Sequence, residues 1–273
     1  MAGISQTVLI RGCGDVGSAV AHQLHEAGFR VVIHDDPSPA HTRRGMAFTD
    51  ALFERKSQLA GVLAKHQPRL EGVERMLECR RAIPVTTHSL DEALSLLAPD
   101  ALIDARMRKR AIPGSLRGRA RFTVGLGPNF SAGDNADVAI ETAWGEDLGR
   151  IVLRGGTRPL EGEPKEIRGH ARDRYIYAPA SGLFVTAQEI GARVEQGEEV
   201  ARIGRTVLAA PLSGRLRGLT HSEVHVELGT KVIEIDPRGD DADIYGIGER
   251  PRRIADGVLA AINEAALPPG RGA

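Results

Sequence analysis

The sequence has little of several features that mark particular classes of protein. It contains 2 cysteines in 273 residues, so neither a disulfide framework nor a paired-cysteine metal motif is available. Lysine plus arginine equals aspartate plus glutamate at 36 each, and this balance favours neither nucleic acid nor a membrane surface as a partner. No apolar run approaches the roughly 20 residues of a membrane-spanning helix, and no secretion signal pattern is present at the N-terminus. We therefore expect a cytoplasmic location.

Catalytic and metal-binding patterns are also scarce. The sequence has no ordered set of Ser, His and Asp, no paired catalytic carboxylates and no H-E-x-x-H helix. His22 and His25 lie three residues apart on a predicted helix, but no third ligand follows at a matching spacing. The sequence therefore predicts no metal site, leaves any catalytic residues unknown and does not decide whether the protein is an enzyme.

What the sequence does contain is a glycine-rich turn between two apolar runs. Residues 8–10 and 31–33 are short apolar runs typical of buried parallel strands. Between them, Gly12, Gly14 and Gly17 form the pattern G-x-G-x-x-G, and helical spacing follows. Such glycines permit a tight turn, let a phosphate approach the backbone and let a helix pack closely on a strand. We predict that the cofactor-binding turn consists of Gly12, Cys13, Gly14, Asp15, Val16 and Gly17.

The residues near this turn add to the prediction. Asp35 follows the second apolar run, about 20 residues after the turn, where a dinucleotide-binding fold places a carboxylate on a ribose hydroxyl. Arg43 and Arg44 follow in the next loop and are either phosphate ligands or a solvated pair at the start of a helix. Cys13 is either a reactive thiol at a helix N-terminus or a small apolar side chain that fills the turn, and we favour the second interpretation.

A second group of candidates lies in the middle of the chain. Asp104 ends another buried apolar run, residues 101–104, and is a candidate at the same sheet edge. Residues 122–124 lead into a second glycine turn, which we expect beside the first turn across a bound ligand. Its candidates are Gly125, Gly127 and Pro128. A basic run after Asp104 is either a solvated face or a phosphate contact, and consists of Arg106, Arg108, Lys109 and Arg110.

The composition changes near residue 150, where short alternating strands and frequent glycines replace the helical pattern. A 32-residue repeat brings Ala178-Pro179-Ala180-Ser181-Gly182 back as Ala210-Pro211-Leu212-Ser213-Gly214. Two interlocking β units would produce such a repeat, since neither buries its apolar face alone. The spacing of the glycines and valines at 191–200 resembles the barrel-sandwich hybrid of biotinyl and lipoyl domains. The lysine that those carriers modify is missing, because residues 204–207 are Gly-Arg-Thr-Val.

The predicted fold class is therefore α/β, with a Rossmann-like N-terminal domain that has a parallel sheet, followed by a β-rich barrel-sandwich hybrid domain. We expect the nucleotide- or cofactor-binding domain at residues 1–149 and the β-rich domain at 150–247, with its repeat core at 175–236. A C-terminal helix and tail would occupy residues 248–273, and the helix would cover the first domain or a partner subunit.

Several motifs together are similar to the selenium-dependent molybdenum hydroxylase system accessory proteins, which are relatives of the xanthine dehydrogenase accessory factors. These motifs are Arg11 to Asp15, Ala21 to Phe29, Arg43-Arg44, Gly125 to Pro128, Ala178-Pro179 and Ile235 to Arg238. The resemblance implies maturation of a molybdenum hydroxylase client protein, with a molybdopterin-type cofactor bound in the N-terminal domain. Cys13 and Glu146 depart from the family, which usually has a small residue at the first position and often has histidine at the second.

Two other functions remain open at this point. The same turn suits an NAD(P)-dependent oxidoreductase, although the second half of the chain offers no proton donor for a substrate. A non-catalytic nucleotide-binding docking protein, with residues 175–236 holding a partner, is the other alternative. The expected ligand is thus a phosphate-bearing small molecule, either a molybdopterin-type cofactor, NAD(P) or another nucleotide, and self-association is left open.

Overall fold

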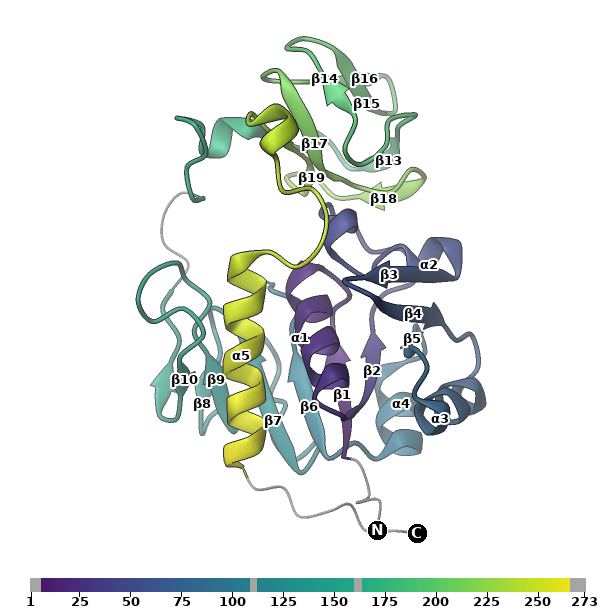
Figure 1. The fold of residues 1–273 in the computed structure, drawn as a ribbon, viewed down its shortest axis with the longest axis vertical. Helices are drawn as coiled ribbons and strands as arrows, with labels where there is room; N and C mark the ends of the chain where they lie inside the picture. Colours follow the sequence, from purple (N-terminus) through teal and green to yellow (C-terminus); the bar gives the residue numbers. More distant parts are fainter. Residues whose placement is uncertain (1–5, 109–111, 160–163, 266–273) are drawn as a thin grey trace.

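The chain folds into two lobes, seen in Figure 1 in a computed structural model that describes residues 6–108, 112–159 and 164–265. A nine-stranded sheet with helices on both faces forms the first, which we call the α/β lobe. Two four-stranded antiparallel sheets form the second, which we call the β lobe. Among the described residues, no helix is both long enough and apolar enough to cross a membrane.

The large sheet has the strand order β10-β9-β7-β6-β1-β2-β5-β4-β3. Its strands are β1 (Thr7–Arg11), β2 (Arg30–His34), β3 (Lys56–Leu59), β4 (Val62–His66), β5 (Ile83–Thr86), β6 (Ala101–Asp104), β7 (Phe122–Leu126), β9 (Val138–Ile140) and β10 (Ile151–Val152). The helices are α1 (Asp15–Glu26), α2 (Ala51–Glu54), α3 (Leu70–Cys79), α4 (Leu90–Leu97) and α5 (Glu249–Glu264), with a short 3-10 turn, η1, at Arg44–Met46. A separate two-stranded sheet pairs β8 (Ser131–Ala132) with β11 (Gly155–Gly156).

Short apolar strands build the centre of the α/β lobe. β1 pairs in parallel with β2 on one side and with β6 on the other. Val8 and Ile10 belong to a core that α1 and α5 cover, whereas Leu9 belongs to a second core that α3 and α4 cover. Because helices cover both faces, these strands are buried on both sides, as their continuous apolar runs predict. Ser89 caps α4 in a capping box with Glu92, a common start for a helix.

The prediction of a Rossmann-like domain with a parallel sheet, followed by a barrel-sandwich hybrid, is wrong. The large sheet is mixed, because β3 pairs with β4 and β10 pairs with β9 in antiparallel fashion at its two edges. Ala60 and Gly61 both have positive φ, at 46° and 89°, which is the two-residue turn that a tight hairpin requires. This turn makes residues 56–66 a hairpin of β3 and β4 at the edge of the sheet.

The β lobe consists of two sheets that share strands from both copies of the repeat. One sheet has the order β12 (Tyr175–Tyr177), β19 (Lys231–Asp236), β17 (Gly214–Leu219) and β14 (Arg193–Val194). The other has the order β16 (Thr206–Ala209), β15 (Glu199–Ile203), β13 (Gly182–Val185) and β18 (Val224–Val226). The first copy of the repeat contains the four strands from β12 through β15, and the second copy contains the corresponding four from β16 through β19. Each sheet therefore combines two strands from each copy.

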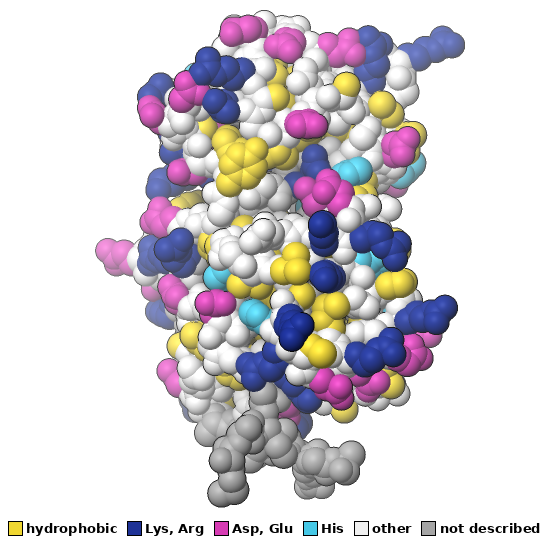
Figure 2. Space-filling view, turned by 45° about the vertical axis from the view of Figure 1, so that its right-hand side comes forward, with side chains coloured by type: hydrophobic (Ala, Val, Ile, Leu, Met, Phe, Trp, Pro, Cys, Tyr) yellow, Lys and Arg dark blue, Asp and Glu magenta, His cyan; other side chains and the backbone are white. Residues whose placement is uncertain are grey.

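The β lobe lies above the end of the α/β lobe toward which β1 runs (Figure 1). After the β lobe, the chain passes the 3-10 turn η3 (Gly239–Asp241) and returns to the α/β lobe as α5, which packs beside α1. The loop after β2 contacts β17, where the Leu219 N–H donates to the Thr42 carbonyl at 2.8 Å. Figure 2 shows both signs of charge interspersed over the face that it presents, as the balanced composition leads one to expect.

Candidate functional site

The first glycine turn packs against itself and against a neighbouring loop. Gly12 adopts φ +110°, which favours glycine, and a Cβ there would lie 3.0 Å from the backbone of Ala105. A Cβ on Gly17 would lie 1.9 Å from the carbonyl oxygen of Gly12. At Gly14, a Cβ would lie 3.2 Å from Nδ1 of His41. The glycine spacing therefore follows from close packing, and the His41 ring lies against the glycine that was predicted to admit a phosphate.

Asp35 is bound by the protein itself. Its carboxylate, only 6% exposed, accepts hydrogen bonds from the N–H groups of Cys13 at 2.5 Å and Asp36 at 2.8 Å. His41 Nε2 lies 2.7 Å from the same carboxylate. Burial alone would raise the pKa of Asp35, but His41 and the two N–H groups hold that pKa below its usual value. Burial alone would lower the pKa of His41, whereas Asp35 holds it above its usual value.

The other members of the first turn also make structural contacts. Cys13 is fully buried, and burial together with nearby Asp35 raises the pKa of its thiol well above the usual value. Because a raised pKa disfavours the thiolate, Cys13 fits the role of an apolar side chain that fills the turn. Val16 is buried in the core, and Asp15 accepts a hydrogen bond from Arg43.

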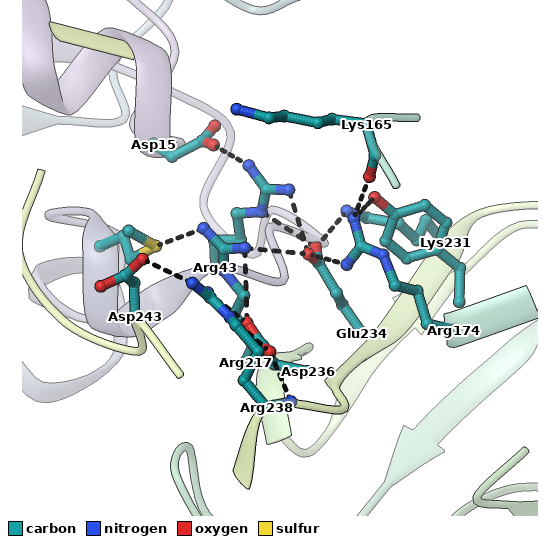
Figure 3. Close-up of polar contacts among 12 residues, drawn as sticks. Asp15, Arg43, Lys165, Arg174, Arg217, Lys231, Glu234, Asp236, Arg238 and Asp243 are labelled. Carbon is teal, nitrogen blue, oxygen red and sulfur yellow. Dashed lines mark hydrogen bonds and ion pairs between the residues drawn. The ribbon is translucent and has the colours of Figure 1, made fainter. Parts of the chain in front are cut away.

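Arg43 and Arg44 join the two lobes. Arg43 donates from Nη1 to Asp15 at 2.9 Å, and from Nε and Nη2 to the two oxygens of Glu234 at 2.9 and 3.1 Å (Figure 3). Arg44 donates from Nε to the carbonyl of Leu219 at 2.9 Å. The two arginines that were predicted as candidate phosphate ligands thus hold the loop after β2 against β17 and β19.

Glu234 is the buried centre of this contact. It is 0% exposed and accepts hydrogen bonds from Arg174 at 2.7 Å and from Lys231 at 3.0 Å, besides those from Arg43. Burial alone would raise the pKa of Glu234, but Lys231 and Arg43 hold it well below the usual value. A buried carboxylate needs such partners to offset its lost hydration. We call this set the interlobe ion cluster: Asp15, Arg43, Arg174, Lys231 and Glu234.

The second glycine turn also has a packing explanation. A Cβ on Gly125 would lie 2.1 Å from the ring of Phe130, and Gly127 has φ +95°. Thr157 Oγ1 donates to the Gly127 carbonyl at 2.5 Å. The two glycine turns do not face each other directly, because β6 lies between β1 and β7. Pro128, the last predicted residue of this turn, lines a cavity.

This cavity, of about 310 Å³, opens at the carboxyl ends of β1, β6 and β7. β2 lies on one side of β1 and β6 lies on the other, so the order of the strands reverses direction beside β1. Open α/β sheets bind ligands at such a topological switch point. The volume lies at the small end of the range for ligand sites, about 300–1,000 Å³. The lining residues are Arg11, Asp104, Arg106, Arg108, Ile112, Pro113, Gly114, Ser115, Leu116, Arg119, Leu126, Pro128 and Phe130.

Asp104 holds two guanidinium groups in place at the cavity. Its side chain is 4% exposed and accepts a hydrogen bond from Arg11 Nη1 at 3.1 Å. Arg106 Nε donates to the two oxygens of Asp104 at 3.0 and 3.1 Å, and Arg106 Nη2 also contacts one of them. One carboxylate thus orients two cations, and a positive charge is left in excess.

Two further arginines add to this excess. The side chains of Arg108 and Arg119 line the same cavity and are 55% and 35% exposed. Burial lowers the pKa of Arg11, Asp104 raises it, and Arg106, Arg119 and Arg108 lower it again, so that it lies below its usual value. In the part of the chain that the structure describes, the buried Nε of Arg11 has no hydrogen-bond partner. A bound anion would relieve this repulsion.

The sequence had indicated only part of this cavity. Asp104 and Pro128 were candidates, and Arg106 and Arg108 were considered as phosphate contacts, whereas Lys109 and Arg110 lie outside the described residues. Arg11 was missed, although it ends a buried strand directly before Gly12 and so had to lie at the ligand-bearing edge. Among the described residues, no group of three or more His, Cys, Asp or Glu side chains is placed to hold a metal ion.

A comparison with known families and proteins gives limited information. No family model matches the chain. It is 35% identical over 257 residues to the Uncharacterized protein YqeB of Escherichia coli strain K12. The match covers 94% of this chain and 47% of that protein, so the chain spans about half the length of this relative.

Two solved structures illustrate how distant the structural matches are. The product-bound ectoine utilization protein EutE (DoeB) of Ruegeria pomeroyi is 16% identical with a TM-score of 0.25, and the match covers 86% of each chain. A succinylglutamate desuccinylase/aspartoacylase of Rhodobacter sphaeroides is 15% identical with a TM-score of 0.29, covering 88% of this chain and 87% of that one. Overlap this low establishes no shared activity.

The predicted kinship with molybdenum hydroxylase accessory proteins is wrong. No family model matches, and the similar protein found by sequence does not carry that description. The glycines that contributed to the resemblance, such as Gly12 and Gly125, are required here by close packing. The maturation function and the molybdopterin ligand are therefore dropped, and neither the family search nor the sequence relative supports an NAD(P)-dependent oxidoreductase or a docking protein.

Proposed function

We propose that this chain binds a small phosphate-bearing molecule in the cavity at the carboxyl ends of β1, β6 and β7. One observation carries the proposal: Asp104 orients the guanidinium groups of Arg11 and Arg106 at the switch point of the sheet. Guanidinium groups offer paired donors that match phosphate geometry, and charge-assisted hydrogen bonds of this kind are strong. Because Asp104 already fixes their orientation, little side-chain entropy is lost when the ligand binds.

The proposal places the ligand beside the first glycine turn and not on it. His41 lies against Gly14, and Asp35 accepts hydrogen bonds from protein donors. The cavity is lined by arginines and by apolar side chains such as Leu116 and Phe130. An apolar pocket with a few convergent polar groups is the usual form of a small-molecule site.

Isothermal titration with inorganic phosphate, pyrophosphate, AMP and NAD⁺ tests the proposal. At least one of these probes should bind the wild-type protein, and Arg106→Gln should weaken that binding by about tenfold or more, since a charged hydrogen bond is lost. Arg202→Gln is the matched control, because Arg202 is exposed on the β lobe and pairs with Glu199. Binding that Arg106→Gln and Arg202→Gln weaken equally, or no binding at millimolar concentration, would refute the site.

A further inference from the structure

We infer that the ligand of this cavity is a terminal phosphate monoester on a compact apolar group, and that it is not a dinucleotide. This inference rests on the proposed function and narrows it to one class of phosphate compound. It follows from the balance of charge in the cavity, from the packing over the first glycine turn and from the apolar side of the lining.

The balance of charge favours a doubly negative group. The cavity has four arginines, Arg11, Arg106, Arg108 and Arg119, against one lining carboxylate, Asp104. The nearest additional acids are Asp36, which lies 3.7 Å from Arg108, and Asp91, which contacts Arg119. Asp36 and Asp91 are 72% and 85% exposed, so these two ion pairs are weak and Arg108 and Arg119 can exchange them for a bound anion. A terminal phosphate carries about −1.5 to −2 at neutral pH, whereas a carboxylate or a phosphodiester carries about −1.

The first glycine turn leaves no place for a bridging pyrophosphate. In a dinucleotide-binding fold the pyrophosphate lies against the middle glycine of the motif and the N-terminus of the helix. Here the His41 ring lies against Gly14, and Asp35 holds that ring at 2.7 Å. The loop after β6 also closes on Gly12, where a Cβ would lie 3.0 Å from Ala105. A ligand of this chain therefore contacts the arginines with its terminal phosphate and does not extend along the first glycine turn.

The remaining lining suits an apolar group. Leu116, Leu126, Pro128 and Phe130 line the cavity together with the arginines. Phe130 is 5% exposed and is held over Gly125, where a Cβ would lie 2.1 Å from its ring. A lining that combines a fixed apolar ring with cationic side chains suits a ligand with one charged end and one apolar end.

A set of probes with the same ring separates the phosphate classes. We would titrate phenyl phosphate, methyl phenyl phosphate and benzoate into the wild-type protein and into Arg11→Gln, Arg106→Gln and the control Arg202→Gln. Phenyl phosphate should bind at least about tenfold more tightly than methyl phenyl phosphate and benzoate. Arg11→Gln and Arg106→Gln should each remove this preference. Circular dichroism spectra that match wild type exclude misfolding of the variants.

The pH dependence provides a second measurement. The affinity for phenyl phosphate should rise between about pH 5 and pH 7, as its second proton leaves near pH 6. The charged groups that line the cavity are Asp104 and the four arginines, and the described lining residues include no histidine. His34 lies nearby on β2 and hydrogen-bonds the His88 carbonyl. Methyl phenyl phosphate has no second proton to lose. Any change of its affinity with pH therefore measures titration of the protein itself.

The outcomes distinguish the two proposals. If the diester binds as tightly as phenyl phosphate and Arg106→Gln weakens both, the monoester inference fails while the phosphate site stands. If benzoate binds most tightly, the class of ligand is a carboxylate, and both proposals fail. If none of the three binds while NAD⁺ binds in an Arg106-dependent manner, the inference of a compact monoester is overturned and the phosphate site is retained.

Discussion

Arg43 and Glu234 form a two-pronged ion pair across 191 positions of the sequence, with Nε to Oε2 at 2.9 Å and Nη2 to Oε1 at 3.1 Å. Arg43 belongs to the loop after β2, and Glu234 lies on β19. Because Glu234 is completely buried, this pair is shielded from water and fixes the β lobe on the α/β lobe.

We expect Glu234→Gln to lower the free energy of unfolding by about 3–5 kcal/mol, because Arg43, Arg174 and Lys231 then lose their common anion. Urea unfolding measures this change. Glu199→Gln is the control, since Glu199 is exposed and pairs with the exposed Arg202, and it should change stability by less than about 0.5 kcal/mol. Equal losses in the two variants would contradict the central role of Glu234.

The pair of His41 and Asp35 predicts a pH dependence of stability. The folded state raises the pKa of His41, so the stabilisation is fully present below about pH 6.5 and is lost as the pH rises through the raised value. Wild-type protein should therefore lose stability between about pH 6 and pH 9, and His41→Gln should lose less over this range. Urea midpoints across that range provide the measurement, and identical slopes for both proteins would rule the prediction out.

The close approach at Gly17 predicts a steric effect. Gly17→Ala places a Cβ 1.9 Å from the backbone oxygen of Gly12, which cannot move without opening the turn. The variant should lose about 1–3 kcal/mol or more, despite the higher helix propensity of alanine. Gly156→Ala is a matched control, because the closest atom to its Cβ would lie at 3.7 Å. Thermal unfolding compares the two, and an unchanged midpoint for Gly17→Ala would count against the packing described here.

The two cysteines should differ in reactivity. Cys13 is buried with a raised thiol pKa, whereas Cys79 is exposed. Iodoacetamide should label Cys79 rapidly in the native protein and should label Cys13 only after unfolding in urea. Peptide mass spectrometry identifies the labelled residue. Rapid labelling of native Cys13 would revive the reactive-thiol interpretation.

Local pattern was sufficient to place much of the α/β lobe. The apolar runs at residues 8–10, 31–33 and 101–104 are β1, β2 and β6. Such features depend on neighbours in sequence, whose effect is visible without knowledge of the fold. The hairpin at Ala60-Gly61 was not predicted, because short apolar segments fit a helix or a strand equally well.

The candidate site was harder to predict, because its charges are paired at long range. Arg43 follows a predicted strand just as a phosphate ligand would, and only the fold shows that Glu234 binds it. Asp35 likewise has the position of a ribose ligand, but His41 and Cys13 bind its carboxylate. Sequence spacing predicts which edge of a sheet a side chain reaches and does not predict which partner it meets there.

The return of the chain as α5 has a consequence for biosynthesis. Both copies of the β-lobe repeat have left the ribosome once Asp236 emerges, so that lobe is complete while synthesis continues. The face of the nine-stranded sheet beside α1 remains open until Glu249–Glu264 follows, and Gly257 then packs where a Cβ would lie 2.0 Å from the Gly149 oxygen. The core around Val20 therefore closes only after the β lobe has been synthesised, when α5 packs against α1.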